Sequence, residues 1–478
     1  MSKENKSSNS VLPTIISLLD SLNKSSVNFV HWKSNDVLHK SVSGENDLDL
    51  LINESSKSIF LEILSKHGIK KAQALRGPKL VPAIEDFYGF DYENQKFFHI
   101  HAHYKLIVGN DSLKNFHINI EDHYFNDKQE THMGLFIPNP SLDFIMFNLR
   151  MSLKFSILSF IKNKKYNLGP SQRNEFNYLK SQSSSSEIEE YCKKFNPTID
   201  HKLIKRISNA IEYDENIISW IQIRSQVESI FRSFSLNSPL KYRIKASFTY
   251  IINGIFSKLR LKVDSSRKIT PTGKVIAITG GDGAGKTTLI NYVYKKFKDN
   301  FHVEIIHMGK PKRSLLTLIY DACLKLLRLT PTYNPEFHEN PRFPGVFFLL
   351  KRVLIARDRL LQATHARRLS KKGVIVVCDR WPIKDISIMD GPVIRNIFKN
   401  THVKKNEFLC KSEEVPYSLI GLPDQLILLD VNPETAVDRK KNEPKDYVRK
   451  RNQTITNFNW SNLPVQIIDA NKDSKVVR

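Results

Sequence analysis

Apolar and polar residues follow two different patterns along the chain. From residue 275 onward, short continuous apolar runs predict the buried strands of a parallel sheet. These runs are 275–279, 303–308, 374–378, 426–430 and 465–469. Between them, apolar spacing of three or four residues predicts helices over 287–297 and 346–370. Strands that alternate with helices predict an α/β fold with a doubly wound parallel sheet over residues 265–478.

The part of the chain before residue 265 has mostly helical spacing from residue 151 onward. Ile217, Ile218 and Ile221 illustrate this spacing, which predicts a mainly helical connecting domain over 151–264. The apolar segment 142–161 contains charged residues and therefore predicts a buried helix rather than a membrane span.

Two stretches of turn-forming residues predict interruptions. Residues 181–186, Ser-Gln-Ser-Ser-Ser-Ser, predict a loop. Residues 265–273 combine Ser, Pro and Gly with charged side chains and predict a linker. The main domain boundary is therefore expected near residue 265.

Charge is distributed unevenly over the 478 residues, whose formal net charge is +24. Residues 265–478 carry 38 Lys and Arg against 21 Asp and Glu, whereas residues 1–150 carry 16 against 18. A basic C-terminal part suits an anionic ligand, although a solvated basic surface explains the excess equally well. The hydrophobic content of 40% excludes a wholly disordered chain.

The cysteines and the apolar runs indicate in which cellular compartment the protein is expected. Four widely separated cysteines exclude a disulfide scaffold and a Cys-x-x-Cys site. The N-terminal apolar run 11–19 is short and has no cleavage site, and no run of eighteen uncharged apolar residues occurs. We therefore expect a cytoplasmic protein in a reducing environment.

A phosphate-binding loop follows the first strand of the predicted α/β domain. Residues 280–287 match the motif G-x-x-x-x-G-K-[ST] at every fixed position. The sequence of this loop is Gly280, Gly281, Asp282, Gly283, Ala284, Gly285, Lys286 and Thr287. Glycines allow backbone N–H groups to approach phosphates, and the helix N-terminus adds partial positive charge. We expect Lys286 to reach the β- and γ-phosphates of ATP and Thr287 to bind Mg²⁺.

A carboxylate follows the strand 374–378. In open α/β sheets, ligands bind beyond the carboxyl ends of the strands. Asp379 is therefore expected beside the phosphate-binding loop, where it would hold Mg²⁺ or its water. Asn432, Pro433 and Glu434 follow the strand 426–430 and have the pattern of a helix N-terminus.

Over about 275–470 the chain resembles the thymidylate kinase family. The resemblance lies in the loop from Gly280 to Thr288, in Asp379-Arg380-Trp381, in Arg359 twenty residues before Asp379, and in residues 432–439. It implies ATP and Mg²⁺ as cofactors, a nucleotide or phosphorylated small molecule as acceptor, and a homodimer.

The resemblance also implies roles for individual residues. Arg359 and Arg380 would bind the acceptor phosphate, and Asp282 an acceptor hydroxyl. Arg439, Arg449 or Arg451, in a basic lid, would neutralise the transferring phosphoryl group. The family's Arg-Glu-Pro-Gly-Gly segment is absent, and residues 311–344 form a proline-rich insertion. The acceptor is left open between dTMP, another nucleotide and a different phosphorylated metabolite.

A second candidate site lies in residues 1–150. Asp47 and Asp49 are two apart in a predicted strand and share one face, where they could chelate a divalent metal. This pair resembles the Asp-x-Asp strand of minimal nucleotidyltransferases, which implies an α+β domain. His99, His101 and His103 share a strand face that could also bind metal. Asp86, Asp91 and residues 27–34, which include His31-Trp32-Lys33, are expected nearby.

Three functions are compatible with these patterns. The first is a P-loop kinase that acts on a nucleotide-like acceptor. The second is a P-loop ATPase that binds nucleic acid or a membrane surface through its basic part. The third is a bifunctional or regulatory fusion with N-terminal nucleotidyltransferase activity. No helicase-type motif set occurs, and aromatics are not interleaved with the basic runs, which argues against nucleic-acid binding.

Overall fold

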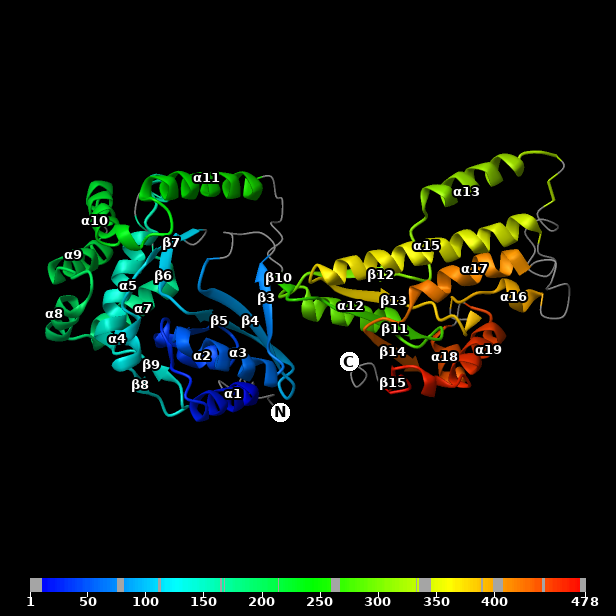
Figure 1. The fold of residues 1–478 in the computed structure, drawn as a ribbon, viewed down its shortest axis with the longest axis horizontal. Helices are drawn as coiled ribbons and strands as arrows, with labels where there is room; N and C mark the ends of the chain where they lie inside the picture. The colour runs from blue at the N-terminus through cyan, green and yellow to red at the C-terminus, as the bar shows by residue number, and fades with distance from the viewer. Residues whose placement is uncertain are drawn as a thin grey trace, which may run out of the picture. The chain divides into compact units, whose positions relative to one another are not determined.

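The computed structural model describes residues 11–74, 81–110, 113–163, 166, 168–213, 215–258, 267–331, 333–334, 345–387, 390–398, 407–440 and 443–472. The chain divides into two compact units, residues 1–265 and 266–478, which are coloured blue to green and green to red in Figure 1. Each unit has hydrophobic clusters of its own. Among the described residues, no helix has the length and apolar character to cross a membrane.

The first unit contains a mixed sheet. Its strands are β1 (Phe29–His31), β2 (Leu48–Ile52), β3 (Lys70–Ala74), β4 (Ile84–Asp91) and β5 (Lys96–His103). They lie side by side in the order β1-β2-β5-β4-β3. The pair β2–β5 is parallel, whereas the other neighbours are antiparallel. Two short ribbons accompany this sheet: β6 (Ile107–Asn110) with β7 (Leu113–His117), and β8 (Gln129–Glu130) with β9 (Phe136–Ile137).

The two faces of this sheet pack into different cores, because side chains alternate along a strand. Leu48, Leu50 and Ile52 face a cluster that includes apolar residues of α1 (Pro13–Lys24) and α3 (Lys57–Lys66). Leu51 of the same strand belongs to the larger helical cluster. A short helix, α2 (Leu38–Val42), precedes β2.

The helical cluster is built around α5 (Pro140–Lys154), which is buried along nearly its whole length. The other helices of this layer are α4 (Glu121–Asn126), α6 (Ile157–Asn163), α7 (Pro170–Gln182), α8 (Ser185–Lys194), α9 (His201–Glu212), α10 (Ile217–Ile230) and α11 (Pro239–Lys258). The segment 151–264, predicted as a separate connecting domain, thus packs into the first unit and shares its core.

Two predictions of irregular structure need correction. The predicted loop over 181–186 is shorter than expected, because α7 continues to Gln182 and α8 begins at Ser185, so that only residues 183–184 interrupt the helices. Serine suits helix starts, and the backbone N–H of Ser184 donates to Ser141 Oγ (2.9 Å). Within the predicted linker, residues Arg267–Ile269 form the short strand β10, and Ile269 N–H donates to the carbonyl oxygen of Gly373 (2.9 Å).

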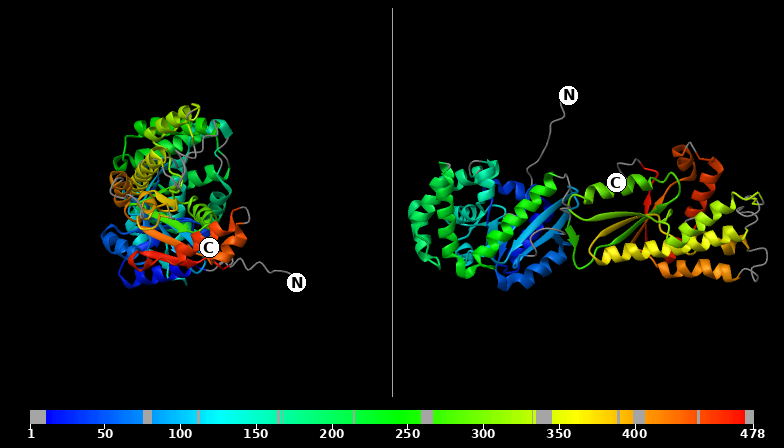
Figure 2. Two further views of the ribbon diagram at one scale, coloured as in Figure 1. Left: turned by 90° about the vertical axis from the view of Figure 1, so that its right-hand side faces the viewer. Right: turned by 90° about the horizontal axis from the view of Figure 1, so that it is seen from above.

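The second unit contains the predicted parallel sheet. Its strands are β11 (Val275–Gly280), β12 (Val303–His307), β13 (Ile375–Asp379), β14 (Gln425–Asp430) and β15 (Val465–Asp469). Their order is β12-β13-β11-β14-β15, and every neighbouring pair is parallel. Helices lie on both sides of this sheet (Figure 2). The prediction of a parallel α/β sheet for this part of the chain is confirmed.

The helices of the second unit connect these strands. They are α12 (Lys286–Phe297), α13 (Leu315–Leu327), α15 (Val346–Lys371), α16 (Ile394–Ile397), α17 (Glu407–Ile420), α18 (Pro433–Arg439) and α19 (Lys445–Thr456). The Asn432 side chain accepts the Glu434 N–H (3.0 Å), as its sequence pattern predicts.

Strand order decides where a ligand can bind. The strand β11 is central, between β13 and β14, and Ile278 is in register with Asp379. Because all strands are parallel, their carboxyl ends meet at one edge of the sheet. The loop after β11 and the residues after β13 therefore lie next to each other at this edge.

Candidate active site

The loop between β11 and α12 requires glycine at specific positions. Gly283 has φ of +82°, which side chains rarely adopt, and a Cβ there would lie 2.8 Å from the carbonyl oxygen of Ala436. Gly281 has ordinary φ, but a Cβ there would lie 1.8 Å from Asn452 Oδ1. The loop is thus packed against α18 and α19, which contribute Ala436 and Asn452.

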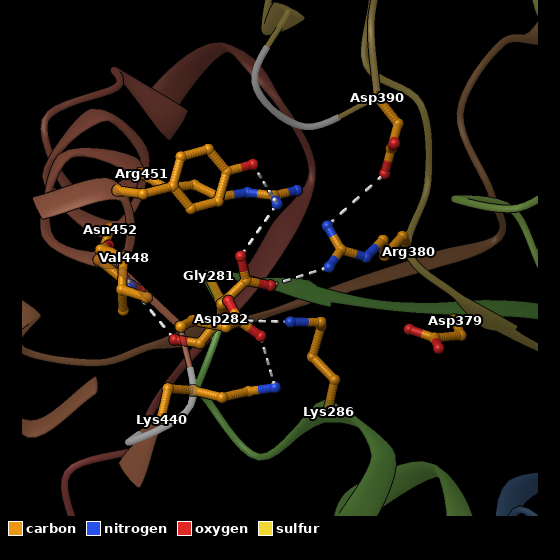
Figure 3. Close-up of polar contacts among 12 residues, drawn as sticks. Gly281, Asp282, Lys286, Asp379, Arg380, Asp390, Lys440, Val448, Arg451 and Asn452 are labelled. Carbon is orange, nitrogen blue, oxygen red and sulfur yellow. Dashed lines mark hydrogen bonds and ion pairs between the residues drawn. The ribbon is translucent and has the colours of Figure 1, made fainter. Parts of the chain in front are cut away.

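Lys286 is the first residue of α12 and is 8% exposed. Its ammonium donates to the carbonyl oxygen of Gly281 (2.6 Å), as Figure 3 shows. Burial, followed by the nearby positive charge of Arg380, lowers the pKa of Lys286 to about 8. Thr287 and Thr288 follow in the same turn and are exposed, so their hydroxyl groups are accessible to a ligand or its metal.

Two arginines converge on Asp282 in the loop (Figure 3). Arg380 Nη2 donates to Oδ1 (2.9 Å), and Arg451 Nη1 donates to Oδ2 (2.9 Å). Burial alone would raise the pKa of Asp282, but the charges of Arg451, Lys286 and Arg380 outweigh it and hold that pKa below its usual value. The loop entrance thus carries three cationic groups around one carboxylate.

The backbone at Arg380 directs its side chain toward the loop. This residue has φ of +70° and its N–H donates to the carbonyl oxygen of Ile278 (2.9 Å). A non-glycine residue in the left-handed region carries strain and is often functional. Arg380 Nη1 also lies 3.7 Å from Asp390 Oδ2, so two carboxylates hold the guanidinium.

Asp379 has an oxygen available for a metal. Its Oδ1 is buried and has no hydrogen-bond partner within the described residues. His307 Nε2 lies 3.4 Å from the other oxygen. Mg²⁺ prefers oxygen ligands such as carboxylates and hydroxyls. Asp379 and Thr287 therefore fit the predicted role in holding Mg²⁺ that accompanies a nucleotide.

Arg359 is buried behind this edge rather than exposed at it. It is 4% exposed, and its guanidinium donates to the Asp390 carboxylate (2.7 Å), to Tyr417 Oη (2.6 Å) and to backbone oxygens of Met308, Gly309 and Asp390. Through Asp390 it also reaches Arg380. The contacts indicate a positioning role, while phosphate binding by Arg359 stays a prediction.

The arginines of the predicted lid form hydrogen bonds and ion pairs with different partners. Arg439 donates to the carbonyl oxygens of Ala470 (2.9 Å) and Gly283 (3.4 Å), so it supports the back of the loop. Arg449 is paired with Glu434 (2.7 Å). Of these arginines, Arg451 is the one bound to Asp282. The roles predicted for Arg439 and Arg449 stay predictions.

Sequence patterns gave no indication of several residues at this site. Asn452 donates to the Asp282 carbonyl oxygen (3.2 Å), and Asp390 joins Arg359 with Arg380. These side chains come from distant parts of the chain and belong to no short motif. A buried polar position on a helix, as at Asn452, is the kind of signal that could have pointed to one of them.

In the first unit, the two carboxylates predicted to bind metal, Asp47 and Asp49, contact different side chains. Asp47 accepts from His99 Nδ1 (2.7 Å), and His99 Nε2 also contacts Asp86 (2.8 Å). Asp49 is paired with Lys33 Nζ (2.8 Å) and His101 Nδ1 (3.1 Å). Metal binding by Asp47 together with Asp49 stays a prediction.

The other residues predicted near this pair are only partly found there. Lys33 and Asp86 are in place, and Trp32 packs edge-on against His103 with ring centroids 4.9 Å apart. Asp91 belongs elsewhere, because its carboxylate accepts from Thr14 and Asn94. The nucleotidyltransferase-like fold of this unit stays a prediction.

Comparison with known proteins supports a kinase-like second unit. No protein-family profile matches the chain. The uncharacterized ATP-binding protein YghR of Escherichia coli is 24% identical over 208 residues, which are 41% of this chain and 80% of YghR. The thymidylate kinase of Ligilactobacillus salivarius is 26% identical over 214 residues, 42% of this chain and 91% of that enzyme. The P-loop region is therefore similar to thymidylate kinases over nearly their whole length.

Solved structures of kinases also match part of the chain. A deoxyadenosine kinase from M. mycoides with bound dATP is 20% identical and covers 42% of this chain and 94% of its own, with a TM-score of 0.27. A thymidylate kinase from Candida albicans is 18% identical and covers 43% of this chain and 88% of its own, with a TM-score of 0.28.

Proposed function

We propose that the second unit transfers the γ-phosphate of ATP to a nucleoside monophosphate, dTMP or a similar nucleotide, or to a related phosphorylated acceptor. One observation carries the proposal. A phosphate-binding loop with a buried lysine lies directly beside two arginines that converge on Asp282. A P-loop that only bound a nucleotide would not need this second group of cations. The thymidylate kinases among the relatives support the same reading.

Positioning and charge neutralisation are the chemistry that phosphoryl transfer demands of a protein. The loop amides and Lys286 would hold the ATP phosphates, with Thr287 and Asp379 as ligands of Mg²⁺. When bound, Mg²⁺ supplies additional neutralisation of phosphate charge. Lys286 would leave the Gly281 carbonyl oxygen for the ATP phosphates.

Arg380 is proposed to bind the acceptor phosphate. Its guanidinium already contacts a carboxylate whose two oxygens present acceptors much as a phosphate does. Arg451, from α19, is proposed to neutralise the transferring phosphoryl group. Asp282, released by the incoming phosphates, would then be available to an acceptor hydroxyl.

Product analysis tests this function. Full-length protein is incubated with ATP, Mg²⁺ and each member of a panel of nucleoside monophosphates, and nucleotides are separated by ion-exchange chromatography. We expect ADP and one diphosphate product in equal amounts, with ADP formation dependent on the acceptor. ADP released at the same rate without any acceptor would instead support an ATPase. No ADP with any acceptor would contradict the proposal.

The site assignment is tested by replacing Lys286. Lys286→Ala should lower turnover by at least about 100-fold, because it removes the ammonium proposed to contact the ATP phosphates. Lys295→Ala, an exposed position on the same helix, is the matched control and should retain activity. Equal turnover of Lys286→Ala and wild type would refute the assignment.

A further inference from the structure

One face of the sheet in the first unit collects histidine and carboxylate side chains. Asp49 on β2 is in register with His101 on β5, and the strands are parallel, so both side chains point to the same side. His103 lies two residues further along β5 on that side. This set, Asp49 with His101 and His103, is called the β2–β5 cluster below.

Ligand atoms in the β2–β5 cluster are close enough to share one ion. One atom from each of its three residues lies within 4.8 Å of the others. Asp49 Oδ1 is 3.1 Å from His101 Nδ1, and His103 Nε2 is 3.3 Å from the same nitrogen. Ligands of a tetrahedral zinc ion at about 2.0–2.1 Å are separated by similar distances.

Proton counting shows that hydrogen bonds do not satisfy the cluster well. A carboxylate only accepts, so the Asp49 contact requires a proton on His101 Nδ1. That single N–H must then also serve His103 Nε2 at 3.3 Å. His103 is fully buried, and its Nδ1 has no hydrogen-bond partner within the described residues. A cation at the centre would accept a lone pair from all three groups at once.

The cluster lies beside a pocket that one of its three residues, His101, lines. His101 and Asp47 line a pocket of about 470 Å³, together with Lys33, Lys114 and Arg150. His103 lies behind it and is 0% exposed. An ion bound by the cluster would thus have protein ligands on its inner side and access to a small molecule from the pocket, as catalytic metal sites require.

We propose that Asp49, His101 and His103 bind a transition-metal dication of the zinc class at the edge of this pocket. Two imidazoles and one carboxylate are a ligand set that suits Zn²⁺, Co²⁺ or Fe²⁺, whereas Mg²⁺ prefers oxygen ligands alone. The site excludes Asp47, which is bound by His99.

Lys33 gives the proposal a distinctive consequence. Its ammonium is 2.8 Å from Asp49 Oδ1 and so occupies the carboxylate that the metal needs. Ammonium and metal must compete for that oxygen. Removing the ammonium in Lys33→Met should therefore tighten metal binding, whereas a purely structural cluster would only lose an ion pair.

Metal titration of the full-length protein tests the proposal. The protein is freed of metal with a chelator and titrated with Zn²⁺ by calorimetry, and with Co²⁺ while visible absorption is recorded. We expect one equivalent of tightly bound metal and the intense absorption of low-coordinate Co²⁺. Asp49→Asn, His101→Gln and His103→Ala should each weaken binding by at least ~10-fold.

Matched variants separate this site from adventitious binding. His99 lies on the same strand face but outside the cluster. The His99→Gln variant should therefore bind Zn²⁺ as the wild-type protein does. Far-UV circular dichroism identifies any variant that fails to fold. The Lys33→Met variant keeps all three proposed ligands, so its metal affinity tests the site even if the ligand variants do not fold. Wild-type protein without Co²⁺ absorption, or binding unchanged in both His101→Gln and His103→Ala, would overturn the proposal.

Discussion

Burial gives Lys286 a pKa of about 8, well below the ordinary lysine value of 10.5. The free protein therefore begins to lose this charge just above neutral pH. A polyphosphate ligand favours the charged ammonium and must raise its pKa on binding. Ligand affinity is thus linked to the protonation of one residue.

We expect ATP binding to weaken as the pH rises. Binding should be near its maximum below pH 8, where Lys286 is protonated, and should fall by roughly 10-fold per pH unit at most above it. Calorimetric titrations with ATP at pH 7.5 and 9 measure the change, and buffers of different ionisation enthalpy report the proton taken up. Lys286→Ala should bind weakly and show no such slope, and an equal slope in that variant would assign the effect to another group.

Arg380 is the arginine whose backbone is shaped to present it at the loop. Arg380→Ala should raise the KM for the acceptor or lower kcat, by about 10-fold or more, and leave ATP affinity within a factor of two. Steady-state kinetics with each substrate varied in turn, together with ATP titration, distinguish these effects. Arg368→Ala, on the exposed part of α15, is the control. An equal loss of ATP affinity would count against a role in acceptor binding.

At the residue scale, the motif residues could be predicted and their partners could not. Gly280 to Thr287 carry their chemistry in a contiguous sequence. The two arginines bound to Asp282 are 98 and 169 residues away from it, so no local pattern joins them. Arg359 shows the same difficulty, because its position in the sequence suggested a ligand contact while folding buries it among five protein contacts.

Among the elements, α19 contacts the phosphate-binding loop through two adjacent residues. Asn452 on this helix donates to the Asp282 carbonyl oxygen and also lies where a side chain on Gly281 would have to go. Arg451, the preceding residue, binds the Asp282 carboxylate. The position of α19 and the shape of the loop are therefore mutually dependent.

A pair of substitutions tests this dependence. Gly281→Ala should lower stability by about 1–3 kcal/mol and weaken ATP binding, because the new methyl group collides with Asn452 Oδ1. Thermal unfolding and ATP titration measure the two losses. Adding Asn452→Ala removes the obstacle, so the double variant should bind ATP better than Gly281→Ala alone. A double variant that is worse in both assays would show that the collision is not the cause.

Element prediction was most accurate where the pattern is contiguous. The strand 465–469 has the expected bounds, and 426–430 and 374–378 are each shifted by a single residue at one or both ends. The order of the strands depends on which apolar faces pack together and could not be read from the sequence. The serine-rich stretch contains the predicted break but only over residues 183–184, because serine is common both in loops and at helix starts. The contact of Ser184 with Ser141, which is distant in the sequence, could not be read from the local pattern.

At the scale of the whole chain, two units have separate hydrophobic clusters. We expect two unfolding transitions in a calorimetric scan, because each cluster can melt as its own cooperative unit. ATP with Mg²⁺ at about 100 times its Kd should stabilise one of them by about 2.7 kcal/mol, which corresponds to roughly 5–10 °C.

The Lys286→Ala variant provides the comparison for this experiment. It should retain both transitions and lose most of the ATP-dependent shift. A single transition that ATP shifts as a whole would show instead that the two units unfold together. Zn²⁺ should raise the other transition if the β2–β5 cluster binds metal.

Under the proposed kinase function, the two guanidinium groups on Asp282 have a consequence for product release. Before substrate binds, the Asp282 carboxylate holds both arginines, so an inorganic anion would have to displace it to bind them. After phosphoryl transfer, the same carboxylate would bind the two arginines again as the diphosphate products leave. Asp282 would then compete with the product for Arg380 and Arg451, and replacing Asp282 should slow product release.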